Sequence, residues 1–258
     1  MDVWREATNN WSELRVAMGC EQIKVRGGLI HVYPIQRSGT FYNSAFVQQP
    51  KSFMIEEIER LFEKRNLPFS IILPSLKPYG ALRKSLERQQ YSLAPAWVLM
   101  THTELTGESN PEVRVVEIDS SRLCEWFELQ DAFPHAESST STRLKMIEKV
   151  SKQKSSQLLM ASLHGRPVGA GLLFMKGEVA SIHMVATLNE FKRRHVATTV
   201  TLEAICRALK NKAGLIWLRT RKSGVGEKVY SRIGFRAVSD ILSYTKTPQD
   251  EDSNLPPK

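Results

Sequence analysis

Residues 185–200 read VATLNEFKRRHVATTV, and residues 215–235 read LIWLRTRKSGVGEKVYSRIGF. In the first segment an apolar strand runs into a basic turn, and a helix follows the turn directly. Lys192, Arg193 and Arg194 therefore lie at a helix N-terminus, where backbone N–H groups lack partners within the helix and the helix dipole is positive. This turn has the features of a phosphate-binding site, although a solvated basic turn has the same composition.

Positive charge is concentrated around this turn. The chain has a formal net charge of +9, and residues 191–222 contain nine basic residues and a single acid, Glu203. Charge of one sign in one segment favours a polyanionic partner, either a phosphorylated cofactor or a nucleic acid. Part of the charge has a simpler explanation, because Arg207, Lys210 and Lys212 lie near a helix C-terminus, where cations suit the dipole.

The length and composition exclude several classes of protein. With 258 residues, 41% of them hydrophobic, the chain can form one large domain or two smaller ones. Its three cysteines, Cys20, Cys124 and Cys206, lie far apart and form no CxxC motif, which argues against a disulfide framework or a metal site. No run approaches the ~18 apolar residues of a membrane span, and no signal peptide is visible. We expect a cytoplasmic protein.

The segment from residue 113 to residue 244 alternates strand and helix patterns. Short apolar runs separated by Gly-containing turns predict three strands in an antiparallel meander. The helix after the basic turn connects two strands that we expect to be parallel. This order predicts an α/β (α+β) fold with a mixed, mostly antiparallel sheet flanked by helices. The expected strands are 113–118, 157–163, 168–175, 179–186 and 215–220, with a last strand pair from 235 to 244, and the expected helices are 120–133, 143–153, 195–210 and 225–233.

Residues 112–246 resemble the GNAT superfamily of acyl-CoA-dependent N-acetyltransferases in the order of these elements and in three motifs. The signature loop of that superfamily reads Gln/Arg-x-x-Gly-x-Gly/Ala, and the matching positions here are Lys192, His195 and Ala197. The lead-in VATLNEF is similar to the Thr-Leu-Pro-Glu of many members, with Asn189 in place of the proline. The closing VYSRIGF places Tyr230 where the catalytic tyrosine of the family usually stands.

The resemblance implies transfer of an acetyl group from acetyl-CoA to a primary amine by direct attack. Tyr230 would protonate the leaving thiolate, because a neutral tyrosine hydroxyl is a hydrogen-bond donor at neutral pH. A backbone amide near Val185 would stabilise the carbonyl oxygen, and the loop amides would hold the pyrophosphate of coenzyme A. The implied cofactor-binding residues are Met184, Val185, Ala186, Lys192, Arg193, Arg194, His195, Val196, Ala197, Thr198 and Ser223.

The residue that removes a proton from the amine is less well determined. His183 lies two residues before Val185, so strand alternation predicts that both side chains share one face, and imidazole titrates in a suitable range. Glu178, Glu190 or a chain of waters are alternatives, and His183 could instead be a packed histidine. Arg219 and Arg221 could contact the cofactor or an acidic acceptor, or they could be solvated strand residues.

His195 is the main departure from the family pattern, because glycine at that position tolerates unusual φ angles. We expect His195 to adopt ordinary helical angles at the start of the helix, with its ring directed away from the phosphates. The alternatives are that its ring obstructs the phosphates or, when protonated, donates to them.

The first hundred residues have features of a second, degenerate copy. In ALRKSLERQQYS (residues 81–92), Leu86 falls at the place of Tyr230, Gln90 at that of Gly234 and Tyr91 at that of Phe235. The basic loop has no counterpart there, since Pro50 lies between strand and helix. An internal repeat predicts two tandem GNAT-like halves, although a simple α+β cap is the alternative. We expect a degenerate first half at residues 1–107, an acetyltransferase domain at residues 108–247 and a disordered tail at residues 248–258.

Other functions remain open at this point. The departure at His195 and the degenerate first half also fit a non-catalytic relative that binds coenzyme A or a partner, and a glycine-acyltransferase-like enzyme is a further alternative. Nucleic-acid binding is disfavoured, because the chain lacks interleaved exposed aromatic residues and any helix-turn-helix or RNA-binding motif. The sequence does not separate a small-molecule acceptor from a protein acceptor, and it leaves the oligomeric state open.

Overall fold

The computed structural model describes residues 1–33, 42–132 and 140–246. The expected disordered tail, residues 248–258, lies outside the described residues. One twelve-stranded sheet runs through the described part of the chain, in the order β1-β2-β3-β4-β12-β6-β11-β10-β9-β8-β7, with the short β5 paired to β12. The strand pairs β3–β4 and β10–β11 are parallel, and the other described pairs are antiparallel. The predicted mixed, mostly antiparallel sheet flanked by helices is confirmed.

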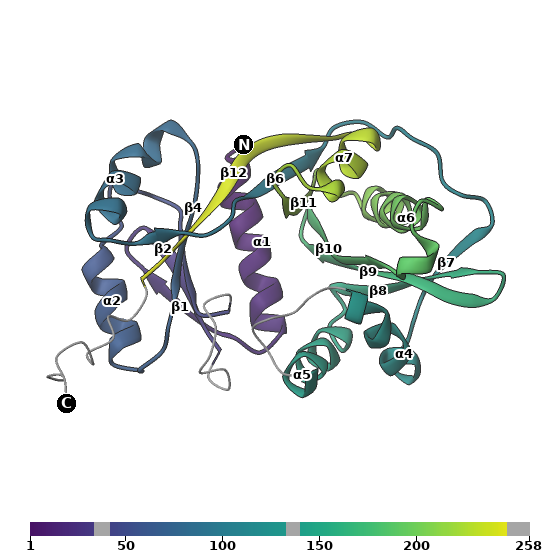
Figure 1. Ribbon diagram of the computed structural model, residues 1–258. Helices are drawn as coiled ribbons and strands as arrows, with labels where there is room; N and C mark the ends of the chain where they lie inside the picture. Colours follow the sequence, from purple (N-terminus) through teal and green to yellow (C-terminus); the bar gives the residue numbers. More distant parts are fainter. Residues whose placement is uncertain (34–41, 133–139, 247–258) are drawn as a thin grey trace, which may run out of the picture.

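The second half contains the predicted meander and crossover. Helix α6 connects β10 to β11, and α6 and α7 cover one face of the sheet while α4 and α5 cover the other (Figure 1). Two expectations were wrong in detail, because short 3₁₀ turns flank α4 and a single long strand replaces the last strand pair. The elements are β7 (Val113–Glu117), α4 (Leu123–Glu128), α5 (Thr140–Ser151), β8 (Ser156–Leu163), β9 (Arg166–Lys176), β10 (Val179–Thr187), α6 (Val196–Lys210), β11 (Leu215–Arg221), α7 (Val225–Arg232) and β12 (Phe235–Thr245).

The first half repeats this order of elements from the helix before the hairpin onward. A helix and an antiparallel hairpin lead to two parallel strands joined by a helix, and a short helix and a strand follow. Gln90 and Gly234, which the sequence aligns, both have positive φ angles of 62° and 93°. The elements are α1 (Val3–Ala17), β1 (Glu21–Val25), β2 (Gly28–Val32), β3 (Ser44–Val47), α2 (Ile55–Glu63), β4 (Ser70–Pro74), α3 (Gly80–Arg88), β5 (Ser92–Leu93) and β6 (Trp97–His102).

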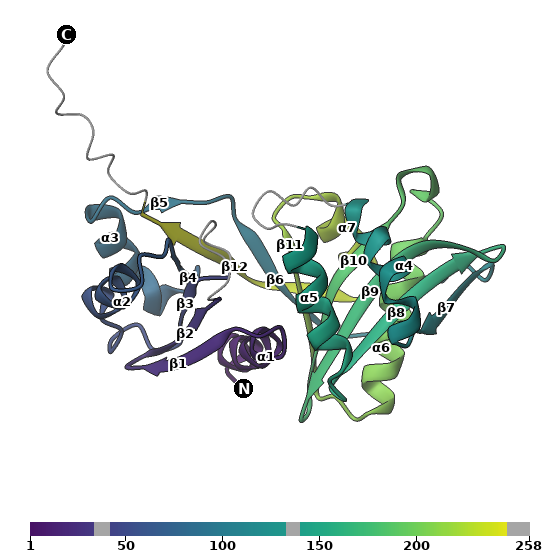
Figure 2. The same cartoon turned by 90° about the horizontal axis from the view of Figure 1, so that it is seen from below.

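The two halves exchange their last strands. Strand β6 of the first half pairs with β11 of the second, with Leu218 opposite Met100. Strand β12 of the second half pairs with β4 of the first, with Leu242 opposite Leu73. Strands β6 and β12 also pair with each other, side by side in the middle of the molecule (Figure 2). The expected boundary at residue 107 therefore separates the two halves of the sequence but does not separate the sheet. Strand β6 of the first half lies among the strands of the second half, and β12 of the second half lies beside the strands of the first.

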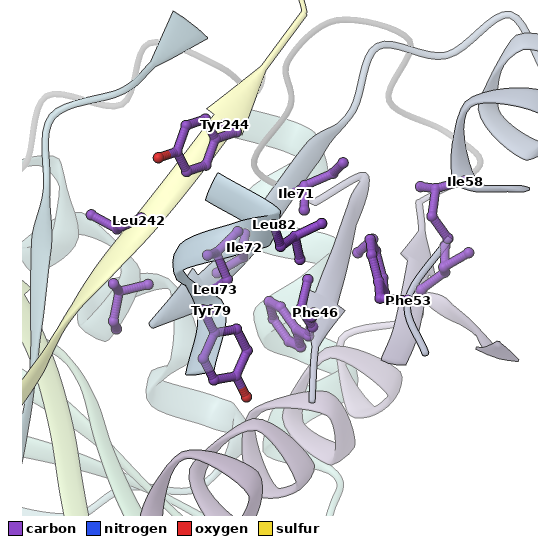
Figure 3. Close-up of a cluster of buried hydrophobic side chains, with 14 of the residues drawn as sticks. Phe46, Phe53, Ile58, Ile71, Ile72, Leu73, Tyr79, Leu82, Leu242 and Tyr244 are labelled. Atoms are coloured by element: carbon purple, nitrogen blue, oxygen red, sulfur yellow. The ribbon is translucent and has the colours of Figure 1, made fainter. Parts of the chain in front are cut away.

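The buried core follows from this exchange. In Figure 3, Leu242 and Tyr244 of β12 lie beside Ile71, Ile72 and Leu73 of β4, in one apolar cluster. Burial of these side chains couples the two halves, since each fully buried aliphatic or aromatic residue contributes roughly 1.5–3 kcal/mol. No helix in residues 1–33, 42–132 and 140–246 has the length and apolar character that crossing a bilayer requires.

A second apolar cluster lies between the sheet and α6, and two glycines of β9 allow α6 to approach closely. A Cβ atom at Gly169 would lie 2.5 Å from Cγ1 of Val196, and one at Gly171 would lie 2.6 Å from Cγ1 of Val200. Both distances are too short for carbon atoms that are not bonded. The first turns of α6 are therefore held directly over β9 and the end of β10.

Candidate active site

Strands β10 and β11 separate part-way along their length. Their parallel register runs from Val179 opposite Leu215 to Ile182 opposite Leu218 and stops there. Strand β10 continues to Thr187 and β11 to Arg221, so the backbone groups of the later residues of β10 are not bonded to β11 in the described structure. An extended ligand can form hydrogen bonds with such an edge as an added strand would.

A β-bulge lies directly after this point of separation. The register with β9 passes from His183 opposite Leu172 to Ala186 opposite Ala170, so Met184 and Val185 have no opposite residue in the ladder. Met184 has a φ of 53°, and its carbonyl oxygen accepts a hydrogen bond of 3.0 Å from Nε2 of Gln130. The carbonyl oxygen of Met184 is therefore already bonded, and the bulge interrupts the pairing of Met184 and Val185 with β9.

The bulge also changes which way the side chains point. His183 contacts Trp217 on the face of the sheet that α1 covers, and Met184 packs against the cluster under α4 and α5. Val185 packs on the opposite face, in the cluster under α6. The prediction that His183 and Val185 share a face was wrong, because an extra residue in one strand reverses the alternation after it.

The basic loop joins this end of β10 to α6. Lys192, Arg193 and Arg194 are exposed, and the guanidinium carbon of Arg194 lies 5.8 Å from the ring centroid of Phe191. Asn110, from the connection before β7, donates from Nδ2 to the carbonyl oxygen of Arg194 at 3.0 Å. Its backbone N–H donates to Oγ1 of Thr199 at 3.0 Å. Asn110 thus fixes the loop on the first turn of α6.

His195 does not have the helical conformation expected from the sequence. It is the residue before α6, with φ 56° and ψ 19°, in the left-handed region, and Arg193 is also left-handed with φ 63°. The expectation was wrong because α6 begins one residue later, at Val196. Histidine is among the non-glycine residues that enter this region more readily, so the chain keeps the backbone conformation that glycine favours. In the described part of the chain α6 has no side-chain cap, and its first N–H groups, at Val196, Ala197 and Thr198, have no partner within the helix.

Tyr230 lies on α7, which packs beside β11. Its ring centroid is 6.0 Å from that of Phe235, and a Cβ atom at Gly226 would collide with Oγ1 of Thr220 and touch the Tyr230 ring. The absence of a side chain at Gly226 therefore lets the helix lie close to the strand. Tyr230 is partly buried, and burial raises the pKa of its hydroxyl to about 12, so the group keeps its proton at neutral pH.

Residues 121–235 match the acetyltransferase (GNAT) family. We call the part of the chain that contains this match the GNAT domain. No curated protein sequence matches the chain.

Solved structures share the fold over nearly the whole chain. A GCN5-related N-acetyltransferase from Kribbella flavida superposes with a TM-score of 0.69 at 15% identity, over 95% of each chain. One from Sphaerobacter thermophilus has a TM-score of 0.66 at 14% identity, over 92% of this chain and 84% of the other. A tandem GNAT protein from the clavulanic acid biosynthesis pathway, solved without AcCoA, has a TM-score of 0.58 at 11% identity, over 86% and 80%. At these identities the likeness concerns the fold alone.

His183 of the GNAT domain lies at the end of the paired part of β10. Its ring meets the ring of Trp217 edge-on, with 5.4 Å between centroids, and its buried Nε2 atom has no hydrogen-bond partner among the described residues. Burial, reinforced by the positive charge of Arg219, lowers the pKa of His183 to about 3. The imidazole is therefore neutral at neutral pH, and it can accept a hydrogen bond.

The two glutamates considered as alternatives lie elsewhere. The carbonyl oxygen of Glu178 accepts from the N–H groups of Gly214 and Leu215, just before the start of β10, where β10 and β11 are paired. Glu190 forms an ion pair with Arg166 on the surface. Neither carboxylate accompanies His183 at the separation of the strands.

Ser223 lies in the turn between β11 and α7, with φ 59°. Its backbone N–H donates to Oε2 of Glu227 at 2.6 Å, so this amide already has a partner within the turn. Two further residues, Asn110 and Gln130, fix the loop and the bulge and were not predicted from the sequence. Both are distant in sequence from the residues that they hold, and no local pattern marks them.

Proposed function

We propose that the GNAT domain transfers an acetyl group from acetyl-CoA to the primary amine of an acceptor by direct attack. The observation that carries the proposal is the separation of β10 from β11 after Ile182, beside a bulge and next to the uncapped N-terminus of α6. An extended ligand with phosphates at one end fits this combination of an open strand edge and a positive helix end.

The residues present fit coenzyme A. Lys192, Arg193 and Arg194 supply positive charge, and the N–H groups of Val196, Ala197 and Thr198 suit the pyrophosphate. His195 holds the turn before α6 in the conformation that directs the chain into this helix end. The pantetheine arm would lie along the backbone of Met184, Val185 and Ala186, where the ladder is interrupted.

The proposed reaction needs no covalent enzyme intermediate. The amine nitrogen attacks the thioester carbonyl carbon, a C–N bond forms, and the C–S bond breaks as the thiolate leaves. A backbone N–H near Val185 stabilises the developing oxyanion, and the Tyr230 hydroxyl gives its proton to the thiolate. Nε2 of His183 accepts a hydrogen bond from the amine or from a water. The proton that the amine nitrogen loses passes to water, and Tyr230 regains from water the proton that it gave to the thiolate. Because its pKa is lowered to about 3, His183 is a weak base.

The first half differs from the proposed site at the two positions that correspond to the basic loop and to Tyr230. The connection from β3 to α2 contains Pro50 in place of a basic loop, and Leu86, at the place of Tyr230, is fully buried. We therefore propose a degenerate GNAT-like half at residues 1–107 and the acetyltransferase domain at residues 108–247. The free cysteines Cys20, Cys124 and Cys206 suit the reducing cytoplasm, which we propose as the location.

The test is an acyl-transfer assay on the full chain. Purified protein is incubated with acetyl-CoA and a panel of amines, and release of free thiol is followed together with the mass of the acetylated product. Thiol release that depends on an amine supports the proposal. Acetyl-CoA binding without thiol release for any amine would indicate a non-catalytic coenzyme A-binding relative. Faster transfer from longer acyl-CoA donors to glycine would indicate a glycine-acyltransferase-like enzyme.

A further inference from the structure

Helix α1 of the first half lies against the sheet of the GNAT domain. Figure 1 shows it in the middle of the molecule, between the strands of the first half and β10. On the side of the first half, Nε1 of Trp4 donates to the carbonyl oxygen of Val47 at 2.7 Å, and Oγ of Ser12 lies 2.6 Å from Nε2 of His31. These contacts fix α1 on β2 and β3, so the residues on its other side have a defined place against the GNAT domain.

On that other side, the side chain of Asn10 bonds the two strands that later separate. Its Nδ2 atom donates to the carbonyl oxygen of Val179, the first residue of β10, at 3.1 Å. Its Oδ1 atom accepts from Nε1 of Trp217 in β11 at 3.2 Å. The two strands are paired from Val179 to Ile182, so Asn10 connects them within the paired part, just before the point of separation.

Both bonds are formed away from water, since Asn10 is 3% exposed and Trp217 is 0% exposed. An indole N–H can only donate and a backbone carbonyl can only accept. A side chain that joins the two must therefore carry an acceptor and a donor, as the carboxamide of asparagine does. A buried polar group that loses its partner is costly, so the fold favours the arrangement in which Asn10 holds both strands.

Trp217 transmits this constraint to His183. The imidazole and the indole meet edge-on, with 5.4 Å between their centroids and 89° between their planes. The ring of Trp11, the residue after Asn10, lies 6.2 Å from that of Trp217 on the side of the first half. The buried Nε2 of His183 has no hydrogen-bond partner among the described residues. The orientation of the imidazole therefore depends on its packing against Trp217.

We propose that Asn10, supplied by the first half, is a positioning residue for His183. Through Trp217 it directs the imidazole toward the place where the acceptor amine reacts, and through Val179 it holds β10 beside β11 up to the separation. This inference rests on the proposed function, since it adds a residue to the same site. It gives the degenerate half a part in the reaction through α1.

The first experiment follows the ring of His183 by NMR, in the full chain with ¹³C-labelled histidine rings and ¹⁵N-labelled indoles. The signal that disappears in His183→Phe identifies the ring. Asn10→Leu keeps a side chain of similar volume and removes both hydrogen bonds. We expect it to shift the signals of His183 and of the Trp217 indole N–H, because ring currents change steeply with the relative position of two rings. The control is Ser12→Ala, a buried polar residue of α1 whose partner His31 lies in the first half. It should leave both signals in place.

The second experiment measures acyl transfer by the same variants. We expect Asn10→Leu to lower kcat by about 10-fold or more, but by no more than His183→Phe does, because a small displacement of a reacting group costs this much. The dissociation constant of acetyl-CoA should stay nearly unchanged. In a His183→Phe background, Asn10→Leu should have little further effect on kcat, since Asn10 is proposed to act through His183. Ser12→Ala should leave kcat unchanged.

Melting temperatures show which variants fold. If Asn10→Leu has no cooperative transition, Asn10→Ser takes its place. Serine leaves a small polar side chain that is too short to join Trp217 and Val179, and the space that it frees allows water to satisfy the carbonyl group. The same shifts and the same fall in kcat are expected for this variant.

Two results would overturn the inference. One is signals of His183 and Trp217 that keep their parent positions in the folded Asn10 variants. The other is a fall in kcat that is equal in the parent and in the His183→Phe background. The proposed function fails separately. If the parent protein releases no thiol with any amine while the His183 signal shifts in Asn10→Leu, acetyl transfer is wrong and the positioning of His183 by Asn10 stands. If transfer occurs and the signals do not shift, the reverse holds.

Discussion

Leu218 of β11 lies opposite Met100 of β6 in an antiparallel register, although the two residues belong to different halves of the chain. The strand that flanks β11 in the GNAT domain is therefore supplied by the first 107 residues. In return, β12 pairs with β4 of the first half. Each part of the sheet is therefore complete only when the other half of the chain supplies its strand.

This exchange predicts that the GNAT domain does not fold alone. Without residues 1–107, β11 would expose its edge, and Trp217, which is 0% exposed in the whole chain, would face water. We expect residues 108–258 to aggregate or to unfold without a cooperative thermal transition. Co-expression of residues 1–107 as a separate chain should restore a cooperative transition. A cooperatively folded segment 108–258 that binds acetyl-CoA on its own would contradict the prediction.

The basic loop should determine donor affinity. Reversing two charges with Lys192→Glu and Arg194→Glu should weaken acetyl-CoA binding at least about 10-fold, and the binding of the parent protein should weaken with added salt. The matched control is Lys210→Glu with Lys212→Glu, which makes the same change in net charge at the other end of α6. Calorimetry that gives both double variants the same affinity would show that net charge, and not the loop, attracts the cofactor.

His195→Gly should stabilise the protein. The residue has a φ of 56°, a region that costs an ordinary side chain on the order of 1 kcal/mol and costs glycine little. We expect the free energy of unfolding to rise by about 1 kcal/mol in urea titrations, with acetyl-CoA affinity kept or improved. His195→Asn serves as the control, because asparagine tolerates this region and should leave stability nearly unchanged. A decrease in stability for His195→Gly would mean that the imidazole makes a stabilising contact.

Tyr230→Phe should lower kcat by about 10²–10⁴-fold and leave the dissociation constant of acetyl-CoA nearly unchanged. The hydroxyl is proposed to act only on the leaving thiolate, and the phenyl ring keeps the packing against Phe235. Because the pKa of Tyr230 is raised to about 12, its ionisation should not limit activity below about pH 10. Single-turnover kinetics give the chemical step directly, and an unchanged rate would remove Tyr230 from the reaction.

Two buried histidines should make the protein sensitive to acid. Burial, with a smaller contribution from nearby arginine charge, lowers the pKa of His31 to about 2 and that of His183 to about 3. The unfolded chain binds protons below about pH 6.5 while the folded chain does not, so stability is present above that pH and is lost as the pH falls toward the folded values.

The expected loss is about 2 kcal/mol for each histidine between pH 7.5 and pH 5. Urea titrations at the two pH values measure it, and His183→Phe, which keeps an aromatic ring against Trp217, should lose less stability over this range than the parent protein. An equal pH dependence in both proteins would show that His183 is not held neutral by the fold.

The helices and strands of the second half could be predicted because their signals are local. The apolar runs between residues 157 and 186 and the basic turn before α6 each reflect the conformational preference of neighbouring residues. Helix α1 was not predicted, and its sequence explains why. Thr8, Asn10, Ser12 and Arg15 are buried polar residues that interrupt its apolar stripe. Their partners include the backbone of β10 and the indole of Trp217, which no local pattern identifies.

The sequence by itself determined the order of elements in the second half, the basic loop, the position of Tyr230 and the likeness of the two halves, since these depend on residues close together in the chain. Only the tertiary structure decided the exchange of β6 and β12, the left-handed angles of His195 and the bulge that separates His183 from Val185. Each of these depends on contacts between distant residues, where burial and hydrogen bonding outweigh local preference by a few kcal/mol.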